Sequence, residues 1–253
     1  MKKQRWLSLI LSLIMLCSMT VTTSAAAAKV TKKVITSVVF DAINNKTTRT
    51  FTYRSDGKIS TQKYQSYYKL TKQTETAYLK YGYNSKGQLI SISKSKSPNG
   101  PFKKMISYTY NSNGTIKTMN AKTFKYNNKN QLIKIYNKSY GDKYTYNAQG
   151  LVKSYFYTYG GTEELTYDSK KNKKTSVIYY RYTTRYNYTN TYKNGLLTKQ
   201  VTKMNGAYQG TTTFKYKTVS VPSTSKAKVD KQQWAIRNDD YLSTIGGKYM
   251  SYN

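Results

Sequence analysis

The chain has 253 residues, with 43 Lys and Arg against 10 Asp and Glu, and no histidine. Without histidine, Ser-His-Asp and Cys-His catalytic groups and most zinc sites are excluded. The net charge of +33 favours polyanionic partners, because it concentrates them near the protein surface. The 29 tyrosines are far above ordinary use, and the lack of a persistent period near 3.6 favours strands over helices.

Residues 1–28 are typical of a secretory signal. Three cations in the first five residues precede the apolar stretch Trp6–Met19, and Ala25–Ala28 supplies the small residues of a cleavage site. The apolar stretch is too short to cross a bilayer, and we expect no membrane span after cleavage. The only cysteine, Cys17, would leave with the signal, so the exported chain would carry a net charge of about +30 and no disulfide.

After a first strand expected over Lys29–Phe40, one nine-residue unit recurs along the chain. Its pattern is aromatic-x-Tyr-Asn-x-x-Gly-x-aliphatic, and Tyr81–Leu89 is a complete copy. Further copies begin at Phe51, Tyr108, Phe124 and Tyr144, and a degenerate copy begins at Leu165. Self-similarity of this kind indicates a repeat architecture, in which each unit is one supersecondary element.

The physics of the unit is that of a β-hairpin. Its two aromatic residues point to one face of a strand, the Asn favours the first corner of a type I turn, and the Gly suits a left-handed position with a G1 bulge. These glycines are Gly57, Gly87, Gly114 and Gly150. Counting residues through the turn predicts the facing pairs Tyr53–Ile59, Tyr83–Leu89, Tyr110–Ile116, Tyr126–Leu132 and Tyr146–Val152.

A shorter copy tests this interpretation. In it, Asn194-Gly195 forms a two-residue turn typical of type I′, so Lys193 should pair with Leu196. Tyr192 then faces Leu197, and the aromatic–aliphatic pair survives the change of turn.

These hairpins predict an all-β fold, an antiparallel meander over residues 29–221; the pattern is compatible with an open sheet and with a closed barrel. Residues 222–253 are predicted to be a linker, Ser223–Lys228, and a tail with one short helix over Asp230–Arg237, started by a capping box. The strand-like runs between the turns are Leu89–Lys96, Lys103–Tyr110, Gln131–Lys138, Val152–Tyr159, Thr175–Tyr188 and Leu196–Lys203.

The unit resembles the YD repeat of Rhs-type bacterial surface and secreted proteins, whose pattern is roughly Tyr-x-Tyr-Asp-x-x-Gly-x-Leu. Asp168 supplies the aspartate of that pattern once, and asparagine replaces it elsewhere. The resemblance covers about residues 50–200 and implies a winding antiparallel sheet used as a shell or scaffold. Larger members have extracellular binding or toxin-carrying roles, but with so few repeats we expect no closed cage around a cargo.

No catalytic apparatus, cofactor site or metal site is recognisable in the sequence. The only acidic doublets are Glu163-Glu164 and Asp239-Asp240. Adjacent strand residues face opposite sides, so neither doublet makes a convergent acid pair, and we expect these residues to be solvated. A carbohydrate-active enzyme is therefore a less favoured function.

Most tyrosines are expected to pack in the core, whereas two tyrosine-rich runs place rings on both faces of the sheet. We predict an exposed aromatic and basic binding surface there, formed by Tyr155, Tyr157, Tyr159, Tyr179, Arg181, Tyr182, Arg185 and Tyr186. The function favoured by the sequence is a secreted, non-enzymatic module that binds anionic cell-wall polymers or acidic polysaccharide or builds surface structure; the alternative is a toxin-related Rhs-type fragment. Nucleic acid is disfavoured as a partner, because export removes the usual substrate and arginine is scarce.

Overall fold

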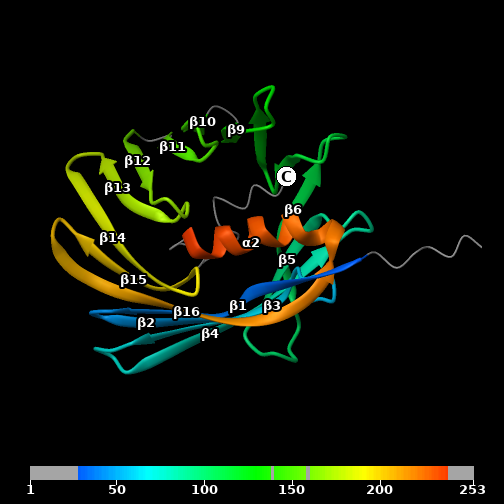
Figure 1. The fold of residues 1–253 in the computed structure, drawn as a ribbon, viewed down its shortest axis with the longest axis horizontal. Coiled ribbons are helices and arrows are strands. Elements are labelled where there is room, and N and C mark those ends of the chain that lie inside the picture. Colours follow the sequence, from blue (N-terminus) through cyan, green and yellow to red (C-terminus); the bar gives the residue numbers. More distant parts are fainter. Residues whose placement is uncertain (1–27, 138–139, 158–159, 239–253) are drawn as a thin grey trace, which may run out of the picture.

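The computed structural model describes residues 28–137, 140–157 and 160–238. Sixteen antiparallel strands follow one another around a closed barrel, which is sealed where β1 pairs with β16 (Figure 1). The predicted all-β meander of hairpins is therefore confirmed, and it closes. Within the described residues, no helix has the length and apolar character needed to cross a membrane. The predicted signal falls, apart from its last residue, outside the described residues, as does the tail after residue 238.

The strands have the following bounds: β1 (Lys29–Ala42), β2 (Asn45–Tyr53), β3 (Ile59–Tyr68), β4 (Gln73–Tyr83), β5 (Leu89–Ser95), β6 (Lys103–Tyr110), β7 (Ile116–Met119), β8 (Lys122–Tyr126), β9 (Leu132–Asn137), β10 (Tyr140–Tyr146), β11 (Val152–Phe156), β12 (Thr162–Tyr167), β13 (Lys173–Tyr179), β14 (Thr183–Lys193), β15 (Leu196–Met204) and β16 (Ala207–Pro222). A 3-10 turn, η1 (Ser223–Ser225), leads into the helix α2 (Lys226–Asn238).

The predicted hairpin register is confirmed. The facing pairs are Tyr53–Ile59, Tyr83–Leu89, Tyr110–Ile116, Tyr126–Leu132, Tyr146–Val152 and, after the shorter turn, Tyr192–Leu197. In the complete unit, the backbone N–H of Asn84 donates to the backbone carbonyl of Gln88, and Gly87 has a φ of 70°. The degenerate copy keeps the same turn, because Lys171 takes the left-handed position with a φ of 62°.

Two predicted segments differ from the structure. The run Thr175–Tyr188 is divided between β13 and β14 by a turn at residues 180–182, which contains no Gly, Pro or Asn to mark it. The predicted linker Ser223–Lys228 is helical, because η1 and α2 begin ahead of the expected capping box. Asp230 lies within the helix, and its carboxylate binds Lys32 Nζ at 2.6 Å.

A ring of tyrosine hydroxyls joins neighbouring hairpins at one rim of the barrel. At six of the tyrosines, the hydroxyl donates to the backbone carbonyl of the aliphatic residue that faces the tyrosine of the preceding repeat around the barrel. Tyr83 thus donates to Ile59 at 2.8 Å, and Tyr110 donates to Leu89 at 2.7 Å. The same bond joins Tyr146 to Leu132, Tyr167 to Val152, Tyr216 to Leu197 and Tyr53 to Ile35. We call this ring the tyrosine ladder.

The ladder extends around most of the barrel because facing pairs alternate with hydroxyl bonds, and it is interrupted at Tyr126 and Tyr192. Tyr216 faces Ile35 across the seam between β1 and β16, and Ile35 accepts the hydroxyl of Tyr53. The Tyr126 hydroxyl lies beside the backbone of Ile116 without reaching full hydrogen-bond geometry. At Tyr192 the hydroxyl binds the Asp168 carboxylate instead of a carbonyl.

The inner wall behind the ladder is the hydrophobic core. The first aromatic residue of each unit points inward, and Phe51, Tyr81, Tyr108, Phe124 and Tyr144 are all buried. Ile59, Leu89, Ile116 and Leu132 complete the same cluster from the returning strands. The alternating pattern of the repeat therefore becomes an apolar inner wall and a polar outer wall.

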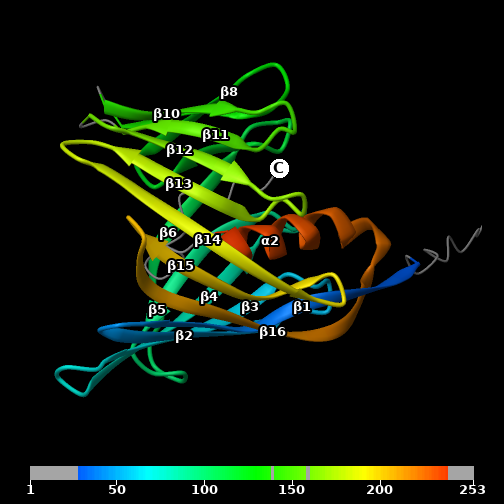
Figure 2. The same cartoon turned by 60° about the vertical axis from the view of Figure 1, so that its left-hand side comes forward.

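Helix α2 lies inside the barrel rather than on its surface (Figures 1 and 2). Val229 and Ile236 are buried, and three side-chain amides satisfy strand N–H groups at the rim. Gln233 Oε1 accepts from Ile35 N at 2.7 Å, Gln232 Oε1 from Ile59 N at 3.2 Å, and Asn238 Oδ1 from Lys173 N at 2.7 Å. A bulge leaves such an N–H group without an acceptor on the neighbouring strand, and the helix supplies that acceptor.

The ladder predicts a cost for removing one hydroxyl. Tyr110→Phe keeps the ring but leaves the Leu89 carbonyl without its donor, so the free energy of unfolding should fall by about 0.5–1.5 kcal/mol in urea titrations. Tyr78→Phe is the matched control, because Tyr78 lies outside the ladder on the opposite face of β4. Equal effects of the two substitutions would contradict the stabilising role of the hydroxyl.

Candidate functional site

The predicted aromatic surface is divided between the two faces of the sheet. Tyr155 and Tyr186 line the barrel interior, and the Tyr157 hydroxyl reaches the same interior carboxylate as Tyr155. Tyr155 is buried, so its assignment to an exposed surface is wrong; its place on β11 turns the ring inward. Tyr179, Arg181, Tyr182 and Arg185 are exposed, and Tyr159 lies outside the described residues.

A row of three lysines crosses the outer wall beside this region. Lys125 on β8 faces Lys134 on β9, and Lys134 in turn faces Lys143 on β10. Phe156 on β11 faces Lys143 and is 43% exposed. We call the three cations the lysine row.

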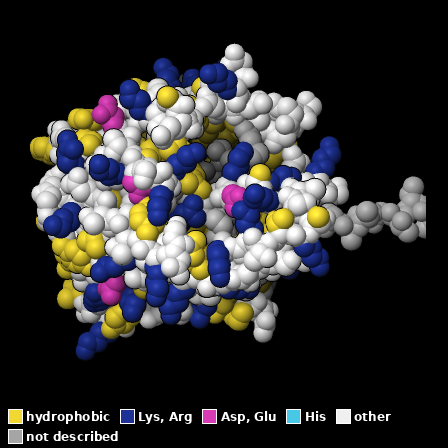
Figure 3. All heavy atoms as spheres, in the orientation of Figure 1, with side chains coloured by type: hydrophobic (Ala, Val, Ile, Leu, Met, Phe, Trp, Pro, Cys, Tyr) yellow, Lys and Arg dark blue, Asp and Glu magenta, His cyan; other side chains and the backbone are white. Residues whose placement is uncertain are grey.

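An aromatic ring lies beside the lysine row. Tyr136 follows Lys134 by two residues on β9 and faces Gly141, which leaves the ring uncovered by a side chain on β10. Lys125 Nζ and Lys134 Nζ lie 5.4 and 5.3 Å from the Tyr136 ring centroid. None of the ion pairs within the described part of the chain includes a lysine of the row. On the face of the molecule shown in Figure 3, the side chains of Lys and Arg far outnumber those of Asp and Glu.

The lysine row departs from the rest of the repeat. The equivalent outer-wall pairs in four other units are neutral hydroxyls that hydrogen-bond to each other, as in Thr109–Thr118 at 2.6 Å and Thr166–Thr175 at 2.6 Å. The unit starting at Phe124 has Lys125 facing Lys134 in that place. Like charges directly opposite each other destabilise a sheet, so this lysine pair lowers the stability of the fold relative to a hydroxyl pair at the same place.

Sequence reasoning missed the row although its signal is present. The residue between the two aromatics of the unit is threonine at 52, 109, 145 and 166 and glycine at 82, but lysine at 125. Counting on from the predicted pair Tyr126–Leu132 places Ile133 opposite Lys125, and the observed bulge beside Tyr126 shifts the partner to Lys134. Comparing the outer-wall position between units would therefore have singled out Lys125, whereas Lys134 required the bulge and Lys143 required the β9–β10 register.

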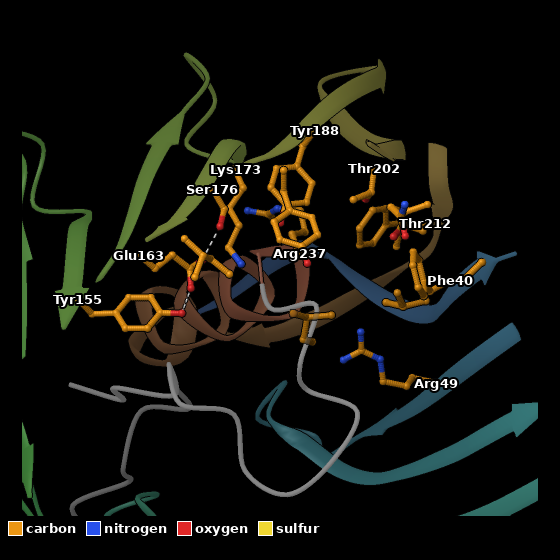
Figure 4. Close-up of a pocket in the computed structure, with 17 residues that line it drawn as sticks. Phe40, Arg49, Tyr155, Glu163, Lys173, Ser176, Tyr188, Thr202, Thr212 and Arg237 are labelled. Atoms are coloured by element: carbon orange, nitrogen blue, oxygen red, sulfur yellow. Dashed lines mark hydrogen bonds between the residues drawn. The ribbon is translucent and has the colours of Figure 1, made fainter. Parts of the chain in front are cut away.

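Inside the barrel, one acid is held in a network of hydroxyls (Figure 4). Glu163 accepts hydrogen bonds from Tyr155, from Tyr157 at 2.8 Å and from Ser176 at 2.6 Å. The prediction that Glu163 is solvated is wrong: it is 7% exposed and faces inward from β12. Glu164 faces the outer wall, so the expectation that this doublet does not converge is confirmed. Asp239 and Asp240 lie outside the described residues.

Asp168, which takes the place of the asparagine of the repeat, organises a polar cluster at the rim. Its carboxylate accepts hydrogen bonds from the Tyr192 hydroxyl, from Asn190 Nδ2 at 2.8 Å and from the backbone N–H of Asn172 at 3.0 Å. Burial would raise the pKa of Asp168, but these hydrogen bonds outweigh it and hold the pKa below its usual range. Asn190 Nδ2 also reaches the Lys173 carbonyl at 3.1 Å, replacing the missing tyrosine bond. The aspartate thus has a structural role where the ladder is interrupted.

The described residues contain no group of three or more His, Cys, Asp or Glu that could hold a metal ion. The surface and the interior instead offer cations, hydroxyls and rings, which bind anions and sugars. This arrangement is suited to recognition of an anionic molecule.

Comparisons with known proteins give no family. No family model matches the chain, and no curated protein is similar to it. The crystal structure of TcdB2-TccC3-Cdc42 matches at 17% identity and a TM-score of 0.29, over 72% of this chain and 11% of that one. A porin-like protein from Bacteroides uniformis ATCC 8492 matches at 12% identity and a TM-score of 0.41, over 72% and 98%. TcdB2-TccC3 without its hypervariable C-terminal region matches at 17% and 0.29, over 66% and 10%. Similarities of this size assign neither a family nor a function.

Replacing the facing lysines of the row by the threonines found in other units should raise the free energy of unfolding. Lys125→Thr/Lys134→Thr restores the hydroxyl pair of the other units, so the free energy of unfolding should rise by up to about 1 kcal/mol at low salt. The gain should shrink at high salt, because exposed charges are then screened.

The reciprocal variant is the control. Thr109→Lys/Thr118→Lys places a lysine pair at the equivalent position of another unit and should lower the stability by a similar amount. A lysine pair that raises the free energy of unfolding at either position would contradict the proposed repulsion between facing lysines.

Proposed function

We propose that this chain is an exported, non-enzymatic barrel of YD-like repeats that binds linear anionic polymers of the bacterial cell wall. The observation that carries the proposal is the lysine row, Lys125, Lys134 and Lys143, on the outer wall. A barrel that places three cations side by side, at a cost to its own stability, is suited to a ligand with several negative charges.

The spacing of the row favours a polymer over a single small anion. Neighbouring strands lie about 4.8 Å apart, so the three lysine positions span roughly 10 Å along the outer wall. Tyr136 and Phe156 flank the row and offer rings to the apolar faces of sugar or polyol units. Phosphate or carboxylate groups repeated along a chain can meet the cations together, and binding then gains from every contact.

Export supports the same partner. The signal-like residues 1–28 direct the chain to a compartment where teichoic acids and acidic polysaccharides are the abundant polyanions. The relation to YD repeats is part of this proposal and rests on the shared motif and on the hairpin that the motif forms.

A toxin-carrying role is less well supported by the geometry. In the described residues, α2 lies inside the barrel, and the pocket between it and the walls formed by β1, β2 and β11–β16 has a volume of about 270 Å³. A space of that size holds a small molecule and not a folded effector. The barrel therefore differs from a shell around protein cargo.

The test is retention on purified bacterial cell walls with and without teichoic acid, over a salt series. We expect the wild-type chain to bind teichoic-acid-bearing walls with a steep salt dependence, because lysine–phosphate contacts release counterions. Lys125→Gln/Lys134→Gln/Lys143→Gln should weaken binding at least tenfold and flatten the salt slope.

The matched control removes three exposed lysines from separate strands, by Lys80→Gln/Lys117→Gln/Lys174→Gln. It has the same net charge as the first variant, so a specific site predicts a smaller loss of binding. Equal losses in both variants would show that net charge alone drives binding, and retention that does not change with salt would rule out the electrostatic mechanism.

A further inference from the structure

The end of the barrel opposite the tyrosine ladder carries exposed apolar side chains on one arc of its turns. The arc consists of the turns between β13 and β14, β15 and β16, β1 and β2, and β3 and β4, which follow one another around the barrel and lie together at the left of Figures 1 and 2. Leu70 is 92% exposed, Tyr182 is 84% exposed, and Ile43 and Tyr180 are each 59% exposed. Together with the exposed Tyr208, at the start of β16, they form what we call the apolar arc.

Other turns of the barrel lack this character. The turns at the ladder rim are polar, as in Asn84–Gly87 and Asn111–Gly114. At the same end as the apolar arc, the β5–β6 turn carries Ser97 and Asn99, and the β7–β8 turn carries Asn120. Turn formation favours such small polar residues and does not call for exposed leucine, isoleucine or tyrosine. Apolar side chains that gather on a surface are characteristic of a contact site.

Hydrogen bonds hold the turns of the arc in place. The backbone N–H of Lys69 donates to the Asn44 carbonyl at 2.9 Å, which ties the turn that carries Leu70 to the β1–β2 turn. The backbone N–H of Arg185 donates to Asn205 Oδ1 at 2.8 Å, which ties β14 to the β15–β16 turn. The apolar side chains therefore project from fixed supports, and a contact there requires little further ordering of the chain.

Positive charge surrounds the apolar side chains. Lys69 Nζ binds the Asp41 carboxylate at 2.7 Å, and the Tyr68 hydroxyl donates to Glu75 at 3.2 Å. These two acids are outnumbered by the cations of the same strand ends and turns, which are Lys46, Lys69, Lys72, Arg181, Arg185 and Lys203. Figure 3, in the orientation of Figure 1, shows hydrophobic and basic side chains side by side along the left edge of the molecule.

This combination matches the surface of an anionic lipid bilayer. Lysine and arginine are attracted to anionic head groups, while tyrosine and leucine enter the boundary between head groups and acyl chains. The side chains project from separate turns along a curved edge, which suits a deformable surface better than the close-packed centre of a protein interface. Arg181, Tyr182 and Arg185 also belong to the aromatic and basic surface predicted from the sequence.

We propose that the apolar arc docks the end of the barrel onto the surface of an anionic lipid bilayer. In this arrangement, Leu70 and Tyr182 enter the head-group boundary, while Lys72 and Arg181 contact lipid phosphates. The contact involves the surface of the bilayer alone. The arc shares no residue with the lysine row, so this inference stands or falls separately from wall binding.

The test is co-sedimentation of the full exported chain with vesicles of phosphatidylglycerol and phosphatidylcholine, and with vesicles of phosphatidylcholine alone. We expect binding to the anionic vesicles to be at least tenfold tighter and to weaken as salt is raised, because the head-group charges are then screened. Leu70→Ser/Tyr180→Ser/Tyr182→Ser should weaken binding at least tenfold although the net charge does not change.

The matched control is Ile90→Ser/Ile133→Ser/Phe156→Ser, which removes exposed apolar side chains from the outer wall. It should leave vesicle binding unchanged, with circular dichroism confirming the fold of both triple variants. Retention on cell walls should be unaffected by the substitutions at residues 70, 180 and 182, which separates this test from that of the proposed function.

Fluorescence distinguishes insertion from attraction by charge alone. Leu70→Trp should show a blue shift of its emission on anionic vesicles and quenching by brominated lipids. Ile133→Trp on the outer wall should show neither, and the wild-type chain with Trp234 gives the background.

Equal losses of vesicle binding in the two triple variants would overturn the proposal, as would a Leu70→Trp variant that brominated lipids do not quench. Dimerisation without vesicles that the substitutions at residues 70, 180 and 182 abolish would assign the arc to a second copy of the chain, and would overturn it as well.

Discussion

The barrel depends on a hydrogen bond that reaches across a hairpin, from the hydroxyl of one tyrosine to the backbone carbonyl beside the preceding tyrosine. Tyr83 to Ile59 and Tyr110 to Leu89 are two of its steps. The backbone pairing of a meander links each strand to its neighbours, but this bond links most of the repeats to the next by the second tyrosine of the unit. The ring then closes because Tyr53, in the first unit, reaches Ile35 on the first strand.

The ladder also explains why the residues on the outer wall can differ from one repeat to another. The fold constrains the inward residues and the tyrosines of the ladder. The residue between the two aromatics of each unit lies on the outer wall, so its identity can vary. Most units fill that position with a threonine that pairs with a hydroxyl, and one unit fills it with Lys125. Inside, α2 covers the rim with Gln232 and Gln233, and the space left beside it is lined by cations. A basic outer row and an interior pocket lined in part by cations thus occur on one scaffold.

The hairpins were predictable because each is encoded by neighbouring residues. The turn at Asn84–Gly87 fixes how Tyr83 faces Leu89, and no distant residue can change that count. Closure was not predictable, because it depends on Ile35 meeting Tyr216 from the other end of the chain. The burial of Glu163 was missed for a related reason: alternation separates it from Glu164, but only the closed barrel decides which face lies inside. The helical start of α2 was missed because Ser223–Lys228 has the composition of a linker.

A pH titration of tyrosine ionisation and strand content tests the ladder most directly. Burial raises the pKa of Tyr110, Tyr146 and Tyr216 to about 12, against about 10 in an unfolded chain. A phenol that holds its proton more tightly in the folded state stabilises the fold fully below pH 10 and loses that contribution as the pH approaches 12. Tyrosinate absorbance from the ladder should therefore appear together with a cooperative loss of the strand signal in circular dichroism, well above pH 10. Complete ionisation of the tyrosines near pH 10 with the strand signal intact would contradict a barrel held together by these hydroxyls.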